Sequence, residues 1–190
     1  MNKPLINIAI YASGAGSNAQ QIIRHFAGSP KAKVSLIVCN KPGAGILQIA
    51  DKEGIPTLLI EKEPFSKGDA YVPELLQRGI DLIVLAGFLW KIPPALIQAY
   101  PDRIVNIHPA LLPNYGGKGM YGRHVHEAVI RNGEKESGIT IHYVDEQYDH
   151  GSTIFQARCP VMPDDNPETL AKRVQELEHR HFPQVIEDLL

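Results

Sequence analysis

The sequence has only two cysteines, Cys39 and Cys159, among 190 residues. This excludes a disulfide framework and a cysteine-based metal motif, and we expect two small core residues in a reducing, cytoplasmic setting. No apolar run approaches the ~18 residues of a membrane span. No charge predominates, because 19 Lys and Arg stand against 21 Asp and Glu. We therefore expect neither a membrane partner nor a nucleic-acid partner.

Two common catalytic motifs are also missing. No serine lies in the G-x-S-x-G turn of hydrolases, and there is no H-E-x-x-H zinc motif. Scattered side chains could still assemble a metal site, with His108, His124, His126, Asp149 and His150 as the candidates. His124 and His126 lack the spacing of a strong ligand pair, so no metal is expected.

Strands and helices are predicted to alternate along a single domain, residues 1–190. The short apolar runs predict strands at 5–12, 33–39, 57–60, 82–86, 103–108, 138–144 and 153–161. Helices are predicted at 18–26, 44–53, 69–77, 123–132 and 167–190. Asn166 and Pro167 suit the start of the last helix, which Pro183 should kink or break.

This alternation indicates an α/β fold with three layers. We expect a mainly parallel, twisted sheet with helices on both faces, and one antiparallel strand near the C-terminal end because only a loop joins the last two strands. Ligands of such sheets bind beyond the carboxyl ends of the strands. The segments expected there are 13–18, 87–92, 106–113 and the loop before Gly151.

A glycine-rich loop with Gly16, Ser17 and Asn18 follows the first strand and opens the first helix. Free backbone N–H groups at a helix start attract an anion, and these side chains suit one phosphate group. The loop formally fits a dinucleotide fingerprint too, but Asn40 stands where a ribose-binding acid is expected. A monophosphate site, a dinucleotide site and a merely structural turn all remain open.

Asn106 and His108 alternate along one predicted strand and therefore share a face. A carboxamide beside an imidazole can stabilise an oxyanion, and histidine can carry a proton near neutral pH. The same pair would also suit a plain core histidine and a turn. Asp149 lies in a later turn; if it approaches His108, its charge should raise the pKa of the imidazole and keep it protonated.

Several motifs occur in an order that resembles the folate-dependent formyltransferase family, in particular its glycinamide ribonucleotide branch. These motifs are 13–18, 86–88, 106–113, 138–144, 149–151 and 154–157. The resemblance covers nearly the whole chain. It implies a Rossmann-like fold that moves a formyl group from 10-formyltetrahydrofolate, a co-substrate, to the primary amine of glycinamide ribonucleotide in purine biosynthesis.

The family's site residues have counterparts here. Asn106, His108 and Asp149 match the catalytic residues: the first two would stabilise a tetrahedral oxyanion, and Asp149 would sustain the charge on His108 and order a proton-carrying water. The implied nucleotide-binding residues are Gly16, Ser17, Asn18, Gln175 and Glu178. The implied folate-binding residues are Leu89, Trp90, Lys91, Ile92, Asn106, Asp145, Glu146, Gln147, Tyr148 and Asp149. Trp90 could instead pack on the surface.

The sequence departs from the family in its basic residues. The stretch 115–123 is longer than in many members, and it adds Lys118 and Arg123, which could meet a phosphate or a glutamate tail or face solvent. Lys67 lies about one position from the family's basic contact to the folate glutamate.

Other functions share parts of this pattern. Methionyl-tRNA formyltransferases carry a further basic domain, so we do not expect that activity. Formyltetrahydrofolate hydrolases usually carry a further regulatory domain, but 10-formyltetrahydrofolate hydrolase and sugar-amine N-formyltransferase remain the alternatives. A non-catalytic folate- or nucleotide-binding module would not need Asn106, His108 and Asp149 together, and a nicotinamide-dependent oxidoreductase is disfavoured by Asn40.

Overall fold

One seven-stranded sheet organises the chain, in the order β3-β2-β1-β4-β5-β6-β7. The computed structural model describes residues 4–190. The strands are β1 Ile6–Ala12, β2 Ala32–Cys39, β3 Thr57–Leu59, β4 Leu82–Leu85, β5 Ile104–His108, β6 Glu136–Tyr143 and β7 Thr153–Pro160. The helices are α1 Ser17–Phe26, α2 Gly45–Glu53, α3 Lys62–Ser66, α4 Val72–Gln77, α5 Pro94–Ala99, α6 Arg123–Arg131 and α7 Pro167–Asp188.

The strand directions confirm the predicted fold class. β3, β2, β1, β4 and β5 run parallel to one another. β6 pairs antiparallel with both β5 and β7, so it is the strand that runs against the others. Because the loop between β6 and β7 contains no helix, the chain can only turn back beside itself, and that turn produces an antiparallel pair.

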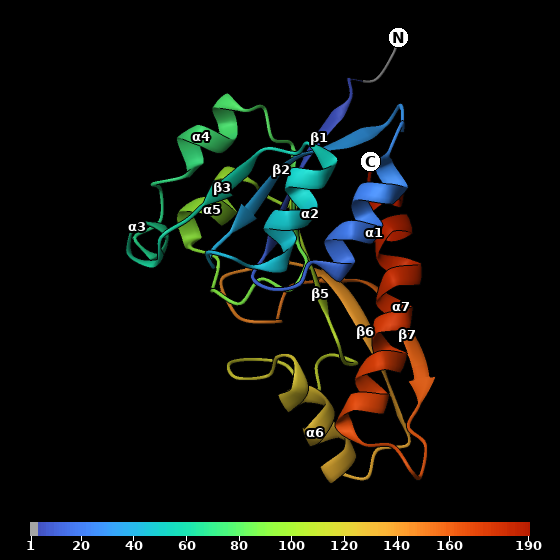
Figure 1. The fold of residues 1–190 in the computed structure, drawn as a ribbon. Coiled ribbons are helices and arrows are strands. Elements are labelled where there is room, and N and C mark those ends of the chain that lie inside the picture. The colour runs from blue at the N-terminus through green and yellow to red at the C-terminus, as the bar shows by residue number, and fades with distance from the viewer. Residues whose placement is uncertain (1–3) are drawn as a thin grey trace.

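The two faces of the sheet bury separate apolar clusters, with helices on both sides (Figure 1). Ile8 and Ile10 of β1 point to the side covered by α1, α2 and α7, whereas Ala9 and Tyr11 point to the side of α3, α4 and α5. Successive side chains of a strand alternate faces, so a strand covered on both faces is apolar throughout. The short helices α3 and α5 were not predicted, because five or six residues carry too little periodicity.

The last helix differs from its prediction at one point. α7 begins as expected, with Asn166 as N-cap in a capping box with Thr169. It does not break at Pro183 but continues to Asp188. An internal proline costs a helix about 3 kcal/mol. Here Phe182, Pro183 and Ile186 are buried in the core, and this packing offsets the cost.

The topology brings the predicted ligand-binding loops to one edge. β1, β4 and β5 are adjacent and parallel, so the segments after Ala12, Leu85 and His108 emerge together. Across the next strand pair, Asn106 stands opposite His142. In the described part of the chain, residues 4–190, no helix is both long enough and apolar enough to cross a membrane.

Candidate active site

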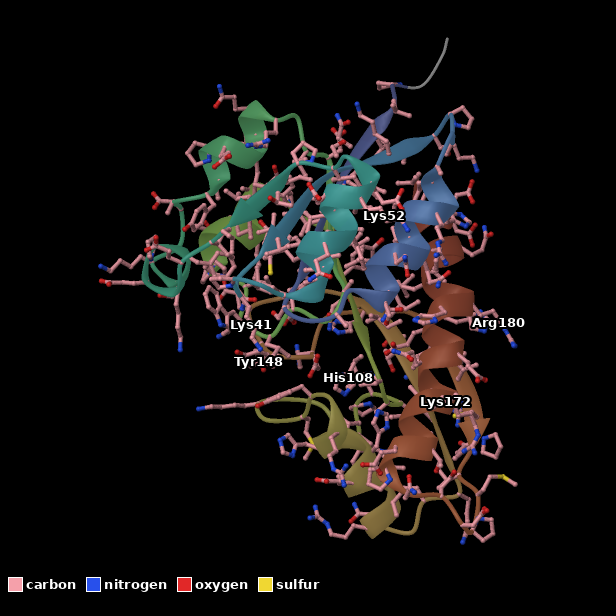
Figure 2. All side chains as sticks on the ribbon, viewed as in Figure 1. Lys41, Lys52, His108, Tyr148, Lys172 and Arg180 are labelled. Atoms are coloured by element: carbon pink, nitrogen blue, oxygen red, sulfur yellow. The ribbon has the colours of Figure 1, made fainter. Side chains whose placement is uncertain are left out.

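A cavity of about 730 Å³ opens at the carboxyl ends of these strands. Its walls come from the segments after β1, β4 and β5, from the stretch 117–123, from α6, and from the face of α7 that carries Gln175 and Glu178. Figure 2 shows His108 between α6 and the upper strands, with Tyr148 on the adjoining loop. The cavity therefore joins residues from distant parts of the chain into one site.

The glycine loop after β1 is held tightly. Gly16 has a φ of 81°, and a Cβ there would lie 2.7 Å from Cδ1 of Ile46. Only glycine accepts both this dihedral and this contact without strain. Ser13 ties the loop to the next segment, because its Oγ accepts a hydrogen bond from the Leu89 N–H at 3.1 Å.

The start of α1 meets the middle of α7. Gln175 Nε2 donates to Ser17 Oγ at 3.1 Å, and Asn18 Nδ2 donates to Glu178 Oε2 at 2.8 Å. His179 Nε2 also lies 3.2 Å from Ser17 Oγ. His179 was missed by the sequence analysis, although its position four residues after Gln175 on the same helix face could have suggested it.

This end of the cavity holds a shielded carboxylate and a free acceptor. Burial raises the pKa of Glu178, and the hydrogen bond from Asn18 only partly opposes that shift. Asn18 Oδ1 is buried and has no hydrogen-bond partner among the described residues. A ligand that donates hydrogen bonds, such as a ribose hydroxyl, would satisfy both groups.

Asn106, His108 and Asp149 converge at the other end. Asn106 Nδ2 lies 3.5 Å from Asp149 Oδ1, and His108 Nδ1 lies 3.5 Å from Asp149 Oδ2. His108 is only 3% exposed. Both contacts are long for hydrogen bonds, so the Asn106 N–H, and Nδ1 of His108 when the imidazole is protonated, could turn to a substrate oxygen between them.

His108 is fixed through its second ring nitrogen. Nε2 lies 2.7 Å from the carbonyl oxygen of Tyr115, which can only accept, so Nε2 carries the proton and Nδ1 faces Asp149. Burial lowers the pKa of His108, while Asp149 and the Tyr115 carbonyl act to raise it. The expected net rise in this pKa is therefore wrong: Asp149 acts in the expected direction, but desolvation outweighs it.

Asp149 is held as a carboxylate. Burial alone would raise its pKa, but the contact with His142, the charge of His108 and the Gly117 N–H together lower it. The Gly117 N–H donates to Oδ2 at 3.0 Å and so fastens the stretch after Tyr115 to the Asp149 carboxylate. A Cβ on neighbouring Gly116 would lie 2.5 Å from Cδ2 of Leu112 and 3.2 Å from Cβ of Asp149, so a larger residue there would require the Leu112 side chain to move.

The residues predicted to bind folate line a smaller cavity of about 70 Å³ beside Asn106 and Asp149. Leu89 lies instead at the larger cavity, and Glu146 lines neither. Trp90 is half-buried and packs against Phe65 and Phe88, with ring centroids 5.9 and 6.1 Å apart. Its side chain thus has a packing role, and Trp90 also lines the smaller cavity.

The loop that bounds the smaller cavity is organised by its own polar groups. Asp145 accepts from the Gln147 N–H at 2.8 Å and from His150 at 2.7 Å. The Tyr148 hydroxyl interacts with the Lys91 backbone. Both predicted folate segments are therefore joined, and the smaller cavity offers apolar walls with backbone polar groups at its edge, which suits a flat heterocycle.

The basic side chains that could contact a phosphate or a glutamate tail differ in their ion-pair partners. Lys67 pairs with Glu63 at 2.6 Å on the surface, and Arg123 pairs with both Glu127 and Glu168. Lys118 lines the cavity and has no ion-pair partner in residues 4–190. It is therefore the lysine or arginine on this wall whose charge is not already balanced. Within the same residues, no group of three or more His, Cys, Asp or Glu side chains could hold a metal ion.

Comparison with known proteins identifies a protein family for this chain. A model described as formyl transferase matches residues 6–186. The chloroplastic phosphoribosylglycinamide formyltransferase of Arabidopsis thaliana is 43% identical over 185 residues, which cover 94% of this chain and 63% of that protein. The phosphoribosylglycinamide formyltransferase of Bacillus subtilis is 36% identical over 187 residues, which cover 96% of this chain and 93% of that protein.

A solved structure of an enzyme with the same name as these relatives is also similar to this chain. The crystal structure of phosphoribosylglycinamide formyltransferase from Bacillus halodurans has a TM-score of 0.88 at 39% identity, with 97% of this chain and 95% of that chain covered. The chain thus spans less than two thirds of the chloroplastic relative's length and nearly all of the two from Bacillus.

Proposed function

The chain belongs to the formyl transferase family, and we propose that it transfers the formyl group of 10-formyltetrahydrofolate to the primary amine of glycinamide ribonucleotide, a step in purine biosynthesis. The observation that carries this proposal is the cavity whose lining joins Asn18, Gln175 and Glu178 at one end to Asn106, His108 and Asp149 at the other. A nucleotide bound at the first end would direct its free amine toward the second.

The phosphate and ribose would lie at the glycine-loop end. Gly16, Ser17 and Asn18 open α1, where backbone N–H groups attract an anion. Gln175 and Glu178 approach from α7 and would bind the sugar hydroxyls. The dinucleotide alternative stays disfavoured by Asn40, which follows β2 where a ribose-binding acid is expected.

Asn106 and His108 would stabilise the charge that develops on the formyl oxygen. The substrate amine attacks the formyl carbon, and the carbonyl oxygen gains negative charge as the bond forms. Asn106 Nδ2 and His108 Nδ1 each lie 3.5 Å from Asp149, and both would donate to the formyl oxygen once Nδ1 is protonated. Burial keeps the pKa of His108 low in the free enzyme, and the developing oxyanion raises it, so the imidazolium is favoured in the transition state.

Asp149 would support both donors and the movement of a proton. Its lowered pKa keeps it anionic, so its charge favours protonated His108. The attacking nitrogen must lose one proton and the leaving nitrogen must gain one, so the transfer is balanced. Asp149 can order a water that carries this proton between the two nitrogens.

10-Formyltetrahydrofolate is a co-substrate that supplies the formyl carbon. Its flat ring would lie against the smaller cavity, whose lining includes the apolar Ile92 together with Asp145, Gln147 and Tyr148. We further propose that Lys118 meets the acidic tail, that residues 1–190 form one catalytic domain, and that the protein works in the cytoplasm. The two buried, unpaired cysteines support a reducing compartment.

A spectrophotometric assay tests the proposed activity. The purified chain is incubated with a 10-formyl folate and with glycinamide ribonucleotide, a sugar-nucleotide amine or no amine. We expect absorbance change only with the glycinamide ribonucleotide. Equal deformylation without an amine would identify a hydrolase, and turnover only with the sugar nucleotide would identify a sugar-amine formyltransferase; either would overturn the proposal.

A further inference from the structure

A buried histidine that the proposed mechanism does not use lies directly behind Asn106. His142 is on β6, opposite Asn106 of β5, and it is 2% exposed. Its Nε2 is 3.0 Å from Asn106 Nδ2 and 3.7 Å from Asp149 Oδ1. Of these two polar atoms, the amide nitrogen of Asn106 is therefore the nearer to Nε2 of His142.

The backbone determines which nitrogen of His142 carries the proton. Nδ1 lies 2.7 Å from the carbonyl oxygen of Tyr143, which can only accept a hydrogen bond. Nδ1 must therefore be protonated. In the neutral imidazole Nε2 is then an acceptor, and it accepts a hydrogen bond from the Asn106 amide.

This bond decides how the Asn106 carboxamide is oriented. With Nδ2 toward His142, the second N–H points to the side of Asp149 Oδ1, 3.5 Å away, where a substrate oxygen could replace the long contact. In the flipped amide, Oδ1 would instead face the His142 lone pair and the Asp149 carboxylate. Each of these two contacts would bring two hydrogen-bond acceptors together without a proton between them. In addition, no N–H of Asn106 would reach the formyl oxygen.

We propose that His142 is a positioning residue, whose Nε2 lone pair holds the Asn106 amide with an N–H directed at the formyl oxygen. The expected effect of His142 on catalysis rests on the proposed function. The orientation of the Asn106 amide does not depend on which reaction the protein catalyses. His142 itself need not touch the reacting atoms.

Two substitutions separate this role from a merely structural one. In His142→Gln the longer side chain can put an acceptor oxygen where Nε2 stood, whereas in His142→Asn the polar atoms reach only as far as Nδ1. Ser137→Ala on the same strand is the control, because Ser137 is equally buried and its Oγ has no partner among the described residues. Circular dichroism and thermal melting check that all three fold.

We expect kcat of His142→Asn to fall by about 10²-fold, as when an oxyanion donor is lost, with KM for the nucleotide unchanged. His142→Gln should stay within about fivefold of wild type, and Ser137→Ala should equal it. In an Asn106→Ala background, His142→Asn should cost less than about twofold, because the group it positions is gone. Equal losses in both His142 variants, or additive effects with Asn106→Ala, would overturn the proposal.

A measurement without turnover separates this inference from the proposed function. The two side-chain ¹⁵N–H protons of Asn106, assigned by their absence in Asn106→Ala, are followed by NMR. We expect one proton protected from exchange in wild type and His142→Gln but not in His142→Asn. Loss of protection in His142→Asn supports the positioning role even if no formyl transfer is detected. Protection that persists in that variant refutes it.

Discussion

The two ends of the cavity differ in how their side chains are arranged before any substrate binds. At the end proposed to bind the nucleotide, Asn18 and Glu178 already form a hydrogen bond of 2.8 Å. At the end proposed to be catalytic, Asn106 and His108 each stop 3.5 Å from Asp149. A binding subsite gains from being complete in advance, because little ordering remains when ligand arrives. A catalytic subsite keeps its donors free for a charge that appears only in the transition state.

The largest expected effect comes from removing the catalytic imidazole. His108→Ala should lower kcat by about 10²–10³-fold, because a donor to the oxyanion is lost, and it should leave KM for the nucleotide nearly unchanged. Steady-state kinetics with both substrates measures this, and melting curves confirm the fold. If the variant keeps more than about a tenth of wild-type kcat, the oxyanion role of His108 is wrong.

The opposite pattern is expected at the nucleotide end. Glu178→Ala should raise KM for glycinamide ribonucleotide by about 10–100-fold, as the loss of a hydrogen bond to a charged group predicts, with kcat within about threefold. Titration of initial rates against the nucleotide gives both constants. A fall in kcat with unchanged KM would contradict the proposal that this end of the cavity binds the nucleotide and the other end carries out catalysis.

Two titratable side chains that line the cavity, Glu178 of α7 and His126 of α6, should respond to pH in opposite directions. Burial raises the pKa of Glu178 from 4.5, so the fold loses stability as pH rises through that higher pKa. Burial and the charge of His108 lower the pKa of His126 from 6.5, so the fold binds fewer protons there than the unfolded chain. Stability is then lost as pH falls below about 6.5.

Melting temperatures of two variants test this contrast. Glu178→Gln should raise Tm by roughly 2–4 °C at pH 8, the effect of about 1 kcal/mol in a chain of this size, and the gain should vanish toward pH 4. His126→Gln should show its gain at pH 5 and none at pH 8. Parallel curves for the two variants would contradict the assigned pKa directions.

The smallest effect is expected at the edge of the cavity. Lys118→Ala should raise KM for a folate with an acidic tail by about two- to fivefold, because an exposed ion pair contributes at most about 1 kcal/mol. KM for the nucleotide should not change, and Lys135→Ala, whose side chain lies outside the cavity, serves as the matched control. Unchanged constants for both substrates would place Lys118 in solvent without a ligand.

Much of the fold could be predicted because its signals are local. Apolar runs marked each strand within about two residues. Helices α3 and α5 were missed because they are too short for periodicity, and α7 was expected to bend or end at Pro183 because propensity ignores tertiary packing. In the site, His142 and His179 were missed: His142 lies inside the 138–144 motif but was given no role there, His179 stands in no motif, and each acts through a residue distant in sequence.

The sequence by itself determined the alternation of strands and helices, the family, and which residue types stand at the ends of β1 and β5. Side-chain period and turn chemistry are properties of neighbouring residues, so they can be read along the chain. Only the tertiary structure decided that burial would outweigh Asp149 at His108, and that His142 would hold the Asn106 amide. Desolvation and hydrogen-bond direction depend on which atoms surround a group from every side, and those atoms come from strands and loops far apart in sequence.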